Sequence, residues 1–452
     1  MRKIEPSTFD PATAYVAIDY HMMDDRRPFI YKTTDFGKTW TNVTGDLPAS
    51  SPLDYVMAVT ENPTRKGMLF AGTGHGFYYS LNDGAHWIKF SEGLPAAPVD
   101  WIVVPKLWHD VVVSTYGRGI YLLKDITPLE QQGLGAELAG NPAGSASAAA
   151  TLFAPHPGYR QARSGHADIT FSLARASRTP ALIQILDSTG TNVRTMRTPT
   201  RAGYNRLSWD VHYDAPTHID LRTTPEANPH IWDEPRFKGK TVRPVTHWGI
   251  EGQQRTGPLG APGHYTVKLT VAGVTTQQPL EIIKDPLITS DAADLAASTA
   301  TQVRIRNDLD TTAALINRIE IMRKQLADAR AAKTTTPDQA SALDALNQHM
   351  MDVELQLLTR TDFNSDDKYY TETPKVYLNL IWLYGEVGVG GGDVAGGPEF
   401  RPTDTSIQML DGIEHDLKAA QTAYVTLMST TVPAFNREMS GKLPAIAPAI
   451  IP

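Results

Sequence analysis

The chain has 452 residues, of which 41% are hydrophobic and 20% charged, and this composition indicates a globular protein of two to four domains. Its formal net charge of -7, without a cluster of Lys and Arg, argues against a nucleic-acid-binding surface. The sequence contains no cysteine, which excludes disulfides and thiolate metal sites.

Residues 1–128 are built from short hydrophobic runs. Examples are residues 15–18, 68–71 and 111–113, which are aliphatic, aromatic or β-branched and are bounded by Gly, Pro, Asp or Asn. Such runs, repeated at regular intervals, are typical of short strands in an all-β domain. We therefore predict an all-β first segment.

Residues 129–165 are rich in Gly, Ala, Ser and Pro, which predicts a linker. Strands are expected again over 166–286, because residues 169–173 and 265–271 alternate with the period of a half-buried strand. Within this segment, residues 214–258 are rich in Pro, His, Trp and Arg and show no periodicity. They are interpreted as a long insertion loop of a β-sandwich.

The last segment, residues 287–452, has helical periodicity. Hydrophobic residues recur every three or four positions over 309–326 and again over 343–357. Pro337 and the threonines before it separate these two stretches, which predicts an antiparallel helical hairpin. A Gly-rich connector over 385–397 precedes a final helix, for which Thr405 and Gln408 suggest a capping box. The predicted fold class is thus multidomain, mainly β and then α.

Two eight-residue turns repeat within the first segment. Residues 33–40 and 80–87 align position by position, and Trp40 and Trp87 are 47 residues apart. One four-stranded propeller blade needs about 40–50 residues, so the period suits a β-propeller. The aligned positions are Thr33, Asp35, Gly37, Thr39 and Trp40 in the first copy and Ser80, Asn82, Gly84 and Trp87 in the second.

The chemistry of this repeat is local. A short carboxylate or amide accepts hydrogen bonds from backbone N–H groups of its own turn, glycine supplies a positive φ, and the tryptophan is expected to pack between sheets. The pattern resembles the Asp-box, or BNR repeat, of sialidases, sortilin-like receptors and xyloglucanase-type glycosidases. In those families the motif is a structural hairpin, so both copies are interpreted as fold-forming and not catalytic.

A wider resemblance covers nearly the whole chain. Residues 9–25, 69–87 and 114–129 are similar to large exported bacterial BNR-repeat proteins, which carry the names glycosyl hydrolase or sortilin-type propeller. This resemblance implies a partial β-propeller over 1–128, an immunoglobulin-like (hook-cap-like) sandwich over 166–286, and a helical hairpin or bundle at the C-terminal end. It also implies a secreted or periplasmic location for the parent protein.

Two complete repeats are too few for a closed ring, because propellers close with about four to eight blades. An incomplete ring leaves sheet faces and strand edges bare in water. We therefore expect a C-terminal piece of a longer protein, with missing blades or a partner chain supplying the rest. The first residues have no apolar run of the kind found in a signal peptide, so the export signal is expected upstream of Met1.

The candidate ligand-binding residues lie in loops between predicted strands. A polar insertion in the first blade suits the ligand face of a propeller, although a solvated loop closed by pairing between its Asp and Arg residues explains it more readily. Two further candidates are a histidine in a predicted turn, His75, and an arginine after the Tyr-Gly pair at 116–117, Arg118. The arginine could donate hydrogen bonds to a carboxylate or phosphate. These candidates are His21, Asp24, Asp25, Arg26, His75 and Arg118.

The function predicted from the sequence is binding or structural support, with carbohydrate or protein as the ligand. The alternative is a glycoside hydrolase, xyloglucanase-like or sialidase-like, whose active site needs the missing blades. Such an enzyme needs two carboxylates about 5–10 Å apart, and no pair can be chosen here. No metal site, cofactor, nucleic acid or membrane span is predicted, and no catalytic residue is assigned.

Overall fold

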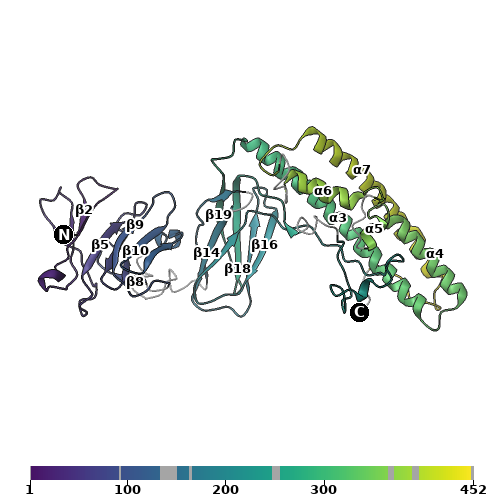
Figure 1. Cartoon of the computed structure of the whole chain (residues 1–452), viewed down its shortest axis with the longest axis horizontal. Coiled ribbons are helices and arrows are strands. Elements are labelled where there is room, and N and C mark those ends of the chain that lie inside the picture. Colours follow the sequence, from purple (N-terminus) through teal and green to yellow (C-terminus); the bar gives the residue numbers. More distant parts are fainter. Residues whose placement is uncertain are drawn as a thin grey trace. The chain divides into compact units, whose positions relative to one another are not determined.

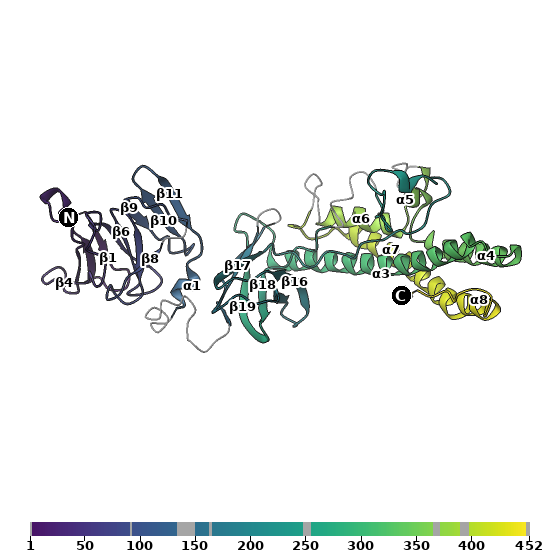
Figure 2. The same cartoon turned by 90° about the horizontal axis from the view of Figure 1, so that it is seen from below.

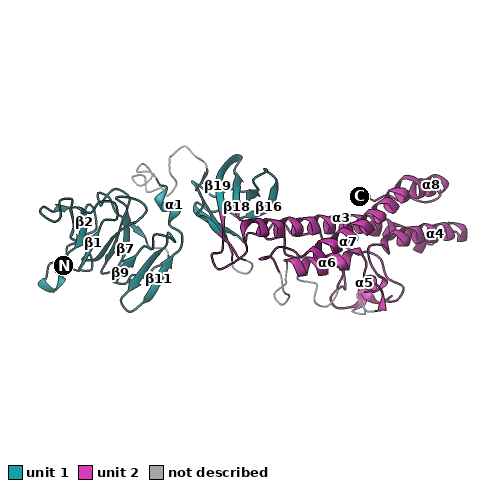
Figure 3. Ribbon diagram, turned by 90° about the horizontal axis from the view of Figure 1, so that it is seen from above, with its two compact units in different colours: residues 1–158, 167–209, 264–281 teal, residues 159–166, 210–263, 282–452 magenta. Residues whose placement is uncertain are grey.

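The computed structural model describes residues 2–90, 93–132, 150–161, 165–246, 255–364, 371–388 and 397–448. The chain forms two compact units (Figure 3): unit 1 comprises residues 1–158, 167–209 and 264–281, and unit 2 comprises residues 159–166, 210–263 and 282–452. Most of the linker predicted over 129–165, namely 133–149 and 162–164, lies outside the described residues. So do residues 389–396 of the predicted Gly-rich connector.

The described residues of the N-terminal segment form three antiparallel sheets, in the orders β1-β2-β3-β4, β5-β6-β7-β8 and β11-β10-β9 (Figure 1). Because each strand pairs with the next one along the chain, every sheet is an up-and-down meander. The strands are β1 (Lys3–Pro6), β2 (Ala14–Ala17), β3 (Ile30–Thr33), β4 (Thr41–Asn42), β5 (Val56–Glu61), β6 (Leu69–Thr73), β7 (Phe77–Ser80), β8 (Ile88–Phe90), β9 (Val99–Val103), β10 (Val111–Thr115) and β11 (Gly119–Leu123).

The same row of cross-strand neighbours recurs in each of these sheets. An aliphatic residue on the first strand lies opposite a small or aliphatic residue on the second, which lies opposite a tyrosine on the third. In an antiparallel sheet such neighbours share one face. The rows are Ile4–Val16–Tyr31, Val59–Ala71–Tyr78 and Ile102–Val113–Tyr121.

Successive sheets pack face to face. Tyr78 and Trp87 of the second sheet share a buried core with Tyr15, Ala17 and Ile30 of the first. The second and third sheets share another core, in which Phe70, Phe77 and Tyr79 lie with Ile102 and Val113. This succession is consistent with part of a propeller-like fold.

Two further sheets follow the short helix α1 (Thr127–Glu130). Their orders are β12-β14-β17 and β13-β19-β18-β15-β16. The buried Trp209 ring meets the Tyr265 ring edge-on, with centroids 5.3 Å apart, between a strand of one sheet and a strand of the other. The strands are β12 (Ala150–Leu152), β13 (Gly158–Arg160), β14 (Ala167–Leu173), β15 (Ala181–Leu186), β16 (Asn192–Thr198), β17 (Gly203–Trp209), β18 (Gly263–Val271) and β19 (Val274–Lys284).

The first two of these strands differ from the sequence-based expectation. β12 and β13 lie inside residues 129–165, which composition predicts to be a linker. β12 pairs with β14, where Leu152 lies opposite Phe171. Both strands are only three residues long, and their sheet partners come from later in the sequence, so local composition does not reveal them.

The helices from α3 onward belong to unit 2. They are α3 (Ala292–Ala331), α4 (Pro337–Glu354), α5 (Arg360–Asn364), α6 (Val376–Val387), α7 (Asp404–Thr426) and α8 (Val432–Glu438), with a π-helical turn, η5 (Leu427–Thr431), between the last two. Figure 2 shows α3 as a long rod with α6 and α7 beside it. Buried residues of all three, including Ile316, Ile381 and Leu417, belong to one core. No helix within the described ranges has the length and apolarity that a membrane crossing requires.

Polar side chains define where these helices begin. Thr336 and Gln339 form a reciprocal capping box at the start of α4, as a Thr before Pro337 allows. For α7, the capping box suggested at Thr405 is wrong. The side chain of Thr403 instead accepts a hydrogen bond from the backbone N–H of Ser406, so the helix begins at Asp404.

The insertion over 214–258 packs within unit 2. Leu221 pairs with Arg243 in an isolated β-bridge, and Ile219, Leu221 and Val245 lie in the same hydrophobic core as the helices. A short 3-10 turn, η2 (Ile231–Asp233), lies between these segments. The sequence predicts a loop of the β-sandwich. Its apolar residues are too widely separated to show a period, and they become buried only against helices formed much later in the chain.

Candidate functional site

The first repeated turn, between β3 and β4, closes on itself through hydrogen bonds. Thr33 Oγ1 accepts from the backbone N–H groups of Asp35 (3.3 Å) and Gly37 (2.9 Å), and it donates to Asp35 Oδ1 (2.8 Å). Asp35 also accepts from the backbone N–H (2.9 Å) and the hydroxyl (2.6 Å) of Thr39. Gly37 has a φ of 82°, which favours glycine. The carboxylate is therefore fully engaged by its own turn.

The second turn, between β7 and β8, repeats this network. Ser80 Oγ accepts from the N–H groups of Asn82 (3.3 Å) and Gly84 (3.0 Å), and Asn82 Oδ1 accepts from the N–H of His86 (2.9 Å). His86 stands where the first turn has Thr39, so the second turn has no counterpart of the hydrogen bond that the Thr39 hydroxyl donates to Asp35. Asp46 instead contacts the His86 ring (2.5 Å), so a neighbouring loop ties this turn.

The two tryptophans of the repeat differ in burial, although both are expected to pack between sheets. Trp87 is 6% exposed and packs against the first sheet. Trp40 is 42% exposed, and its indole N–H donates to Gly37 O of its own turn (3.2 Å). The expectation for Trp40 is therefore wrong, because no sheet among the described residues lies on its side of β1–β4.

Two of the candidate histidines lie on either side of one loop, residues 53–55. The ring of His21, in the 3-10 turn η1 (His21–Met23), stacks on Tyr55 with centroids 4.4 Å apart. Its Nδ1 lies 2.6 Å from Asp19 Oδ1. His75 Nδ1 lies 3.0 Å from Leu53 O. The structure thus brings together loops of the first and second sheets, and Tyr55, which connects them, was not among the sequence-based candidates.

The acidic and basic residues beside His21 pair with one another. Asp25 accepts two hydrogen bonds from the guanidinium of Arg27, at 3.0 and 2.7 Å. Asp24 Oδ1 lies 3.7 Å from Arg26 Nε, and both side chains are exposed. This local pairing accounts for Asp24, Asp25 and Arg26 without a ligand. In the described part of the chain, no group of three or more His, Asp or Glu side chains is placed to hold a metal ion.

The turn after β10 carries the last candidate. Arg118 and Tyr116 are exposed, and within the described ranges Arg118 forms no hydrogen bond or ion pair. The backbone N–H of Tyr116 donates to Pro98 O (2.9 Å), just before β9. Since all three sheets are meanders of the same order, the loops of His21, Tyr55, His75 and Tyr116 lie at the same end of their sheets. The two repeated turns lie at the other end.

Two carboxyl groups near His21, those of Asp19 and Asp25, have lowered pKa values. Burial alone would favour the neutral form of Asp19, but hydrogen bonds from His21 and Arg2 outweigh it and lower its pKa. Hydrogen bonds from Arg27 lower the pKa of Asp25. A glycosidase needs one carboxylic acid with a raised pKa. Neither of these groups has that property.

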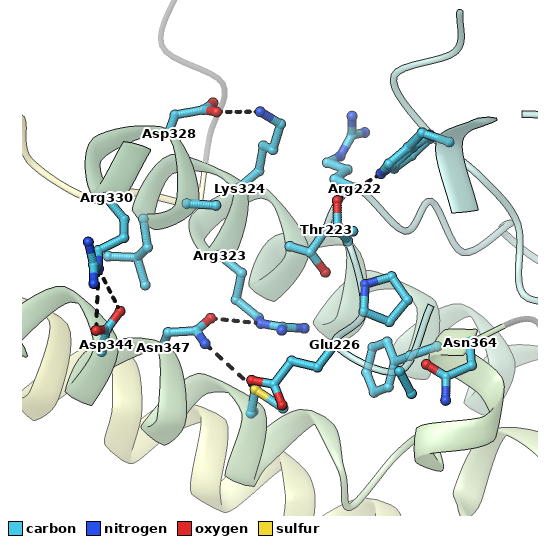
Figure 4. A pocket seen from close by; sticks show the side chains of 18 of the residues that line it. Arg222, Thr223, Glu226, Arg323, Lys324, Asp328, Arg330, Asp344, Asn347 and Asn364 are labelled. Atoms are coloured by element: carbon cyan, nitrogen blue, oxygen red, sulfur yellow. Dashed lines mark hydrogen bonds and ion pairs between the residues drawn. The ribbon is translucent and has the colours of Figure 1, made fainter. Parts of the chain in front are cut away.

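A concave site lies in unit 2. This pocket, of about 710 Å³, lies between α3, α4 and residues 222–241 of the insertion, and its walls combine apolar residues with charged ones (Figure 4). Lys324 pairs with Asp328 (2.5 Å), and Arg330 pairs with Asp344 (3.2 Å). Arg360 forms no ion pair within the described residues. The pocket is therefore lined by apolar side chains and by charged side chains of both signs.

A buried charge cluster lies beneath this pocket. Arg323 Nη1 donates to Glu320 (2.9 Å) on its own helix and to Glu354 (2.7 Å) on α4, and its Nε donates to Asn347 (3.0 Å). Glu320 also accepts from the N–H (2.8 Å) and hydroxyl (2.7 Å) of Thr223. The cluster thereby ties α3, α4 and the insertion together.

Sequence reasoning missed this cluster, although a signal for it exists. Glu320 and Arg323 follow Ile316 and Ile319 by four positions each, so they fall on the apolar stripe of α3. Glu354 follows Met350 on α4 by the same step. Charged residues on a buried stripe, with opposite signs on two helices of a predicted hairpin, indicate an internal ion pair.

Replacing Glu354 with glutamine should flatten the pH dependence of stability in unit 2. Burial raises the pKa of Glu354 from 4.5 to about 8, against the opposing effect of Arg323. A carboxyl whose pKa is raised on folding stabilises the fold below its unfolded pKa and loses that contribution as pH rises through its folded pKa. Wild-type stability should therefore fall between about pH 4.5 and 8.

Urea unfolding followed by helical circular dichroism at several pH values measures this slope. Glu354→Gln should show a smaller loss of stability across the range than the wild type. Asp344→Asn, at the exposed pair on the pocket rim, serves as the control and should keep the wild-type slope. Equal slopes for all three proteins would contradict the assignment to Glu354.

Comparison with known proteins gives no family for this chain. No family model matches, and no curated protein matches. Solved structures with some likeness include a GH74 xyloglucanase from Xanthomonas campestris (12% identity, TM-score 0.23) and a GH74 enzyme from Niastella koreensis (14%, 0.24). Both alignments cover 62% of this chain and 38% of the other chain.

A third structure with some likeness is the extracellular domain of a proposed one-component system from B. thetaiotaomicron. Its identity is 6% and its TM-score 0.20, and the alignment covers 60% of this chain and 30% of that one. The chain thus spans well under half of the length of each of the three proteins. At TM-scores this low, the function must be argued from the residues of this chain.

Proposed function

We propose that this chain is a binding and structural region of an exported Asp-box propeller protein, and that it binds carbohydrate or protein ligands through the loop end of its first three sheets. The observation that carries the proposal is the contact of the His21 and His75 loops with residues 53–55. Aromatic rings, histidines and an arginine are there collected at one end, away from the turns that hold the fold.

The side chains at this end suit recognition of polar ligands. The exposed Tyr116 offers a ring face on which an apolar face of a sugar, or a side chain, can stack. The half-buried stack of Tyr55 on His21 lies at the same end and positions the loops around it. Arg118 offers a fork of donors to a carboxylate or other oxyanion. The acidic side chains nearby are engaged with His21, Arg26 and Arg27. This favours binding over hydrolysis.

The finer features of the fold are part of the same proposal. The repeated turns correspond to Asp-boxes because both have the hydrogen-bond pattern that the motif's chemistry requires. The sheets built from β12 to β19 represent an immunoglobulin-like sandwich with its helical tail after it. Missing blades or a partner chain cover the bare faces of the first and third sheets.

Replacing Tyr116 with alanine should weaken ligand binding about tenfold or more, the loss expected when one stacking contact of about 1.4 kcal/mol is removed. A glycan array probed with the labelled chain first identifies the bound sugar, and calorimetry then compares the variants. Tyr55→Ala should also weaken binding, because it removes the ring on which His21 stacks.

The matched control is Trp108→Ala. Trp108 is also an exposed aromatic residue of the third sheet, but it lies in the β9–β10 loop, at the opposite end from Tyr116. Its replacement should leave affinity unchanged. An equal loss in Trp108→Ala and Tyr116→Ala, or no binding to any glycan or protein probe, would argue against a binding site at this end.

A further inference from the structure

The third sheet carries an exposed apolar face, and the first sheet carries a partly exposed one. On the first sheet the row Ile4–Val16–Tyr31, with the neighbouring Trp40, forms what we name the leading face. Ile4 is 50% exposed and Trp40 42% exposed, whereas Tyr31 is half-buried and Val16 is 4% exposed. In the second and third sheets, the corresponding rows are buried against the preceding sheet. The leading face therefore has the residues of an internal contact but no sheet to pack on among the described residues.

The opposite side of the third sheet, the trailing face, is more apolar still. Its two cross-strand rows are Trp101–Ser114–Ile120 and Val103–Val112–Leu122. The exposed fractions are 52% for Trp101, 44% for Val103, 74% for Ile120 and 51% for Leu122. Lys3 Nζ, from β1 of the first sheet, lies 4.8 Å from the Trp101 ring centroid. A contiguous set of large exposed apolar side chains marks an interaction surface.

The contact between the first and second sheets and the contact between the second and third sheets follow the same packing rule. The second sheet turns its leading-type row, Val59–Ala71–Tyr78, onto the first sheet. The third sheet turns Ile102–Val113–Tyr121 onto Phe70, Phe77 and Tyr79, which lie on the trailing side of the second. A leading-type row thus packs on a trailing side both times. The first sheet exposes a leading face and the third sheet exposes a trailing face. These two faces are therefore complementary, because each contact within the chain joins a leading-type row to a trailing side.

We propose that a second copy of this chain covers these faces, with the trailing face of each copy packed on the leading face of the other. This inference rests on the proposed function in one respect, namely that the three sheets are propeller blades. Head-to-tail contacts form a closed ring when the rotation closes. Two copies of three sheets give six blades, within the range of about four to eight, whereas three copies give nine.

The test is the oligomeric state of the 49.5 kDa chain, measured by sedimentation velocity over a range of concentrations. The wild type should sediment at twice the chain mass. A trailing-face variant, Ile120→Glu with Leu122→Glu, should have the mass of one chain, and so should a leading-face variant, Ile4→Glu with Trp40→Glu. These side chains are exposed, so circular dichroism should show each variant folded. Leu287→Glu, an exposed apolar site outside both faces, should remain dimeric.

Mixing the two face variants distinguishes the head-to-tail arrangement from a symmetric one. Each variant keeps one intact face, so the mixture should regain the dimer mass through a single contact. A leading-face variant that remains dimeric alone would overturn the proposal in favour of trailing face on trailing face. A wild type that stays monomeric would also overturn the proposal. The leading and trailing faces would then be expected to pack against sheets of another polypeptide. Loss of glycan binding in Tyr116→Ala is independent of these outcomes and tests only the proposed function.

Discussion

Replacing Arg323 with methionine is expected to lower the free energy of unfolding of unit 2 by about 3–5 kcal/mol, because the buried carboxyl groups of Glu320 and Glu354 lose their hydrogen-bond donor and its charge. Glu320 and Glu354 are both fully buried, and Arg323 is 8% exposed. Methionine has a similar length, so the change removes charge more than volume. Urea unfolding followed by helical circular dichroism measures the effect, since the helices from α3 onward belong to unit 2.

The control for this change lies on the same helix. Arg330 pairs with Asp344 across the same hairpin, but both side chains are more than half exposed. Arg330→Met should therefore cost about 0–1 kcal/mol. If Arg323→Met were as stable as Arg330→Met, the buried cluster would not hold α3 and α4 together as described.

The second large effect is expected at the tryptophans of the repeat. Trp87→Ala should destabilise the first two sheets by about 3–5 kcal/mol, the cost of a large cavity in a packed core. Trp40→Ala, at the equivalent position of the first copy, should cost about 1–2 kcal/mol because its side chain is partly exposed. Hydrogen exchange of peptides covering β6 and β7, at increasing urea concentration, measures both.

This pair of variants tests the packing rule directly. The two tryptophans occupy the same turn position, and what differs is the sheet that one of them covers. Equal costs would show that each tryptophan stabilises mainly its own turn. In that case the difference in exposure between Trp40 and Trp87 would have no energetic meaning.

Local chemistry made the repeated turns predictable from the sequence. Thr33, Asp35 and Gly37 act within a few residues of one another, so their spacing alone predicts the hydrogen bonds that the structure contains. Strands such as β2, β6 and β10 were also recognisable, because each is a short apolar run between turn residues. β1 (Lys3–Pro6) and β4 (Thr41–Asn42) are not apolar runs and were not recognisable. The hairpin of α3 and α4 was predictable too, because helical periodicity is a local property of the sequence.

Features that depend on distant partners could not be predicted. β12 becomes a strand only by pairing with β14, and the insertion becomes ordered against helices about a hundred residues later. At the candidate site, the sequence predicts His21 and His75 as separate candidates. It does not predict the stack of His21 on Tyr55, because that stack joins residues from two sheets. Tyr31, Tyr78 and Tyr121 occupy equivalent positions in the three sheets, but this equivalence is seen only once the strand register is known. Their spacings along the chain are unequal.

The most direct test of the proposed function is a measurement of sugar release. The chain would be incubated with the glycan that it binds most tightly on the array, and new reducing ends would be quantified over time. Binding with no release above the buffer control is the predicted result, because the pKa values of Asp19 and Asp25 are lowered and both groups are held by hydrogen bonds. Release that grows with the concentration of this chain would contradict a binding role and establish a hydrolase.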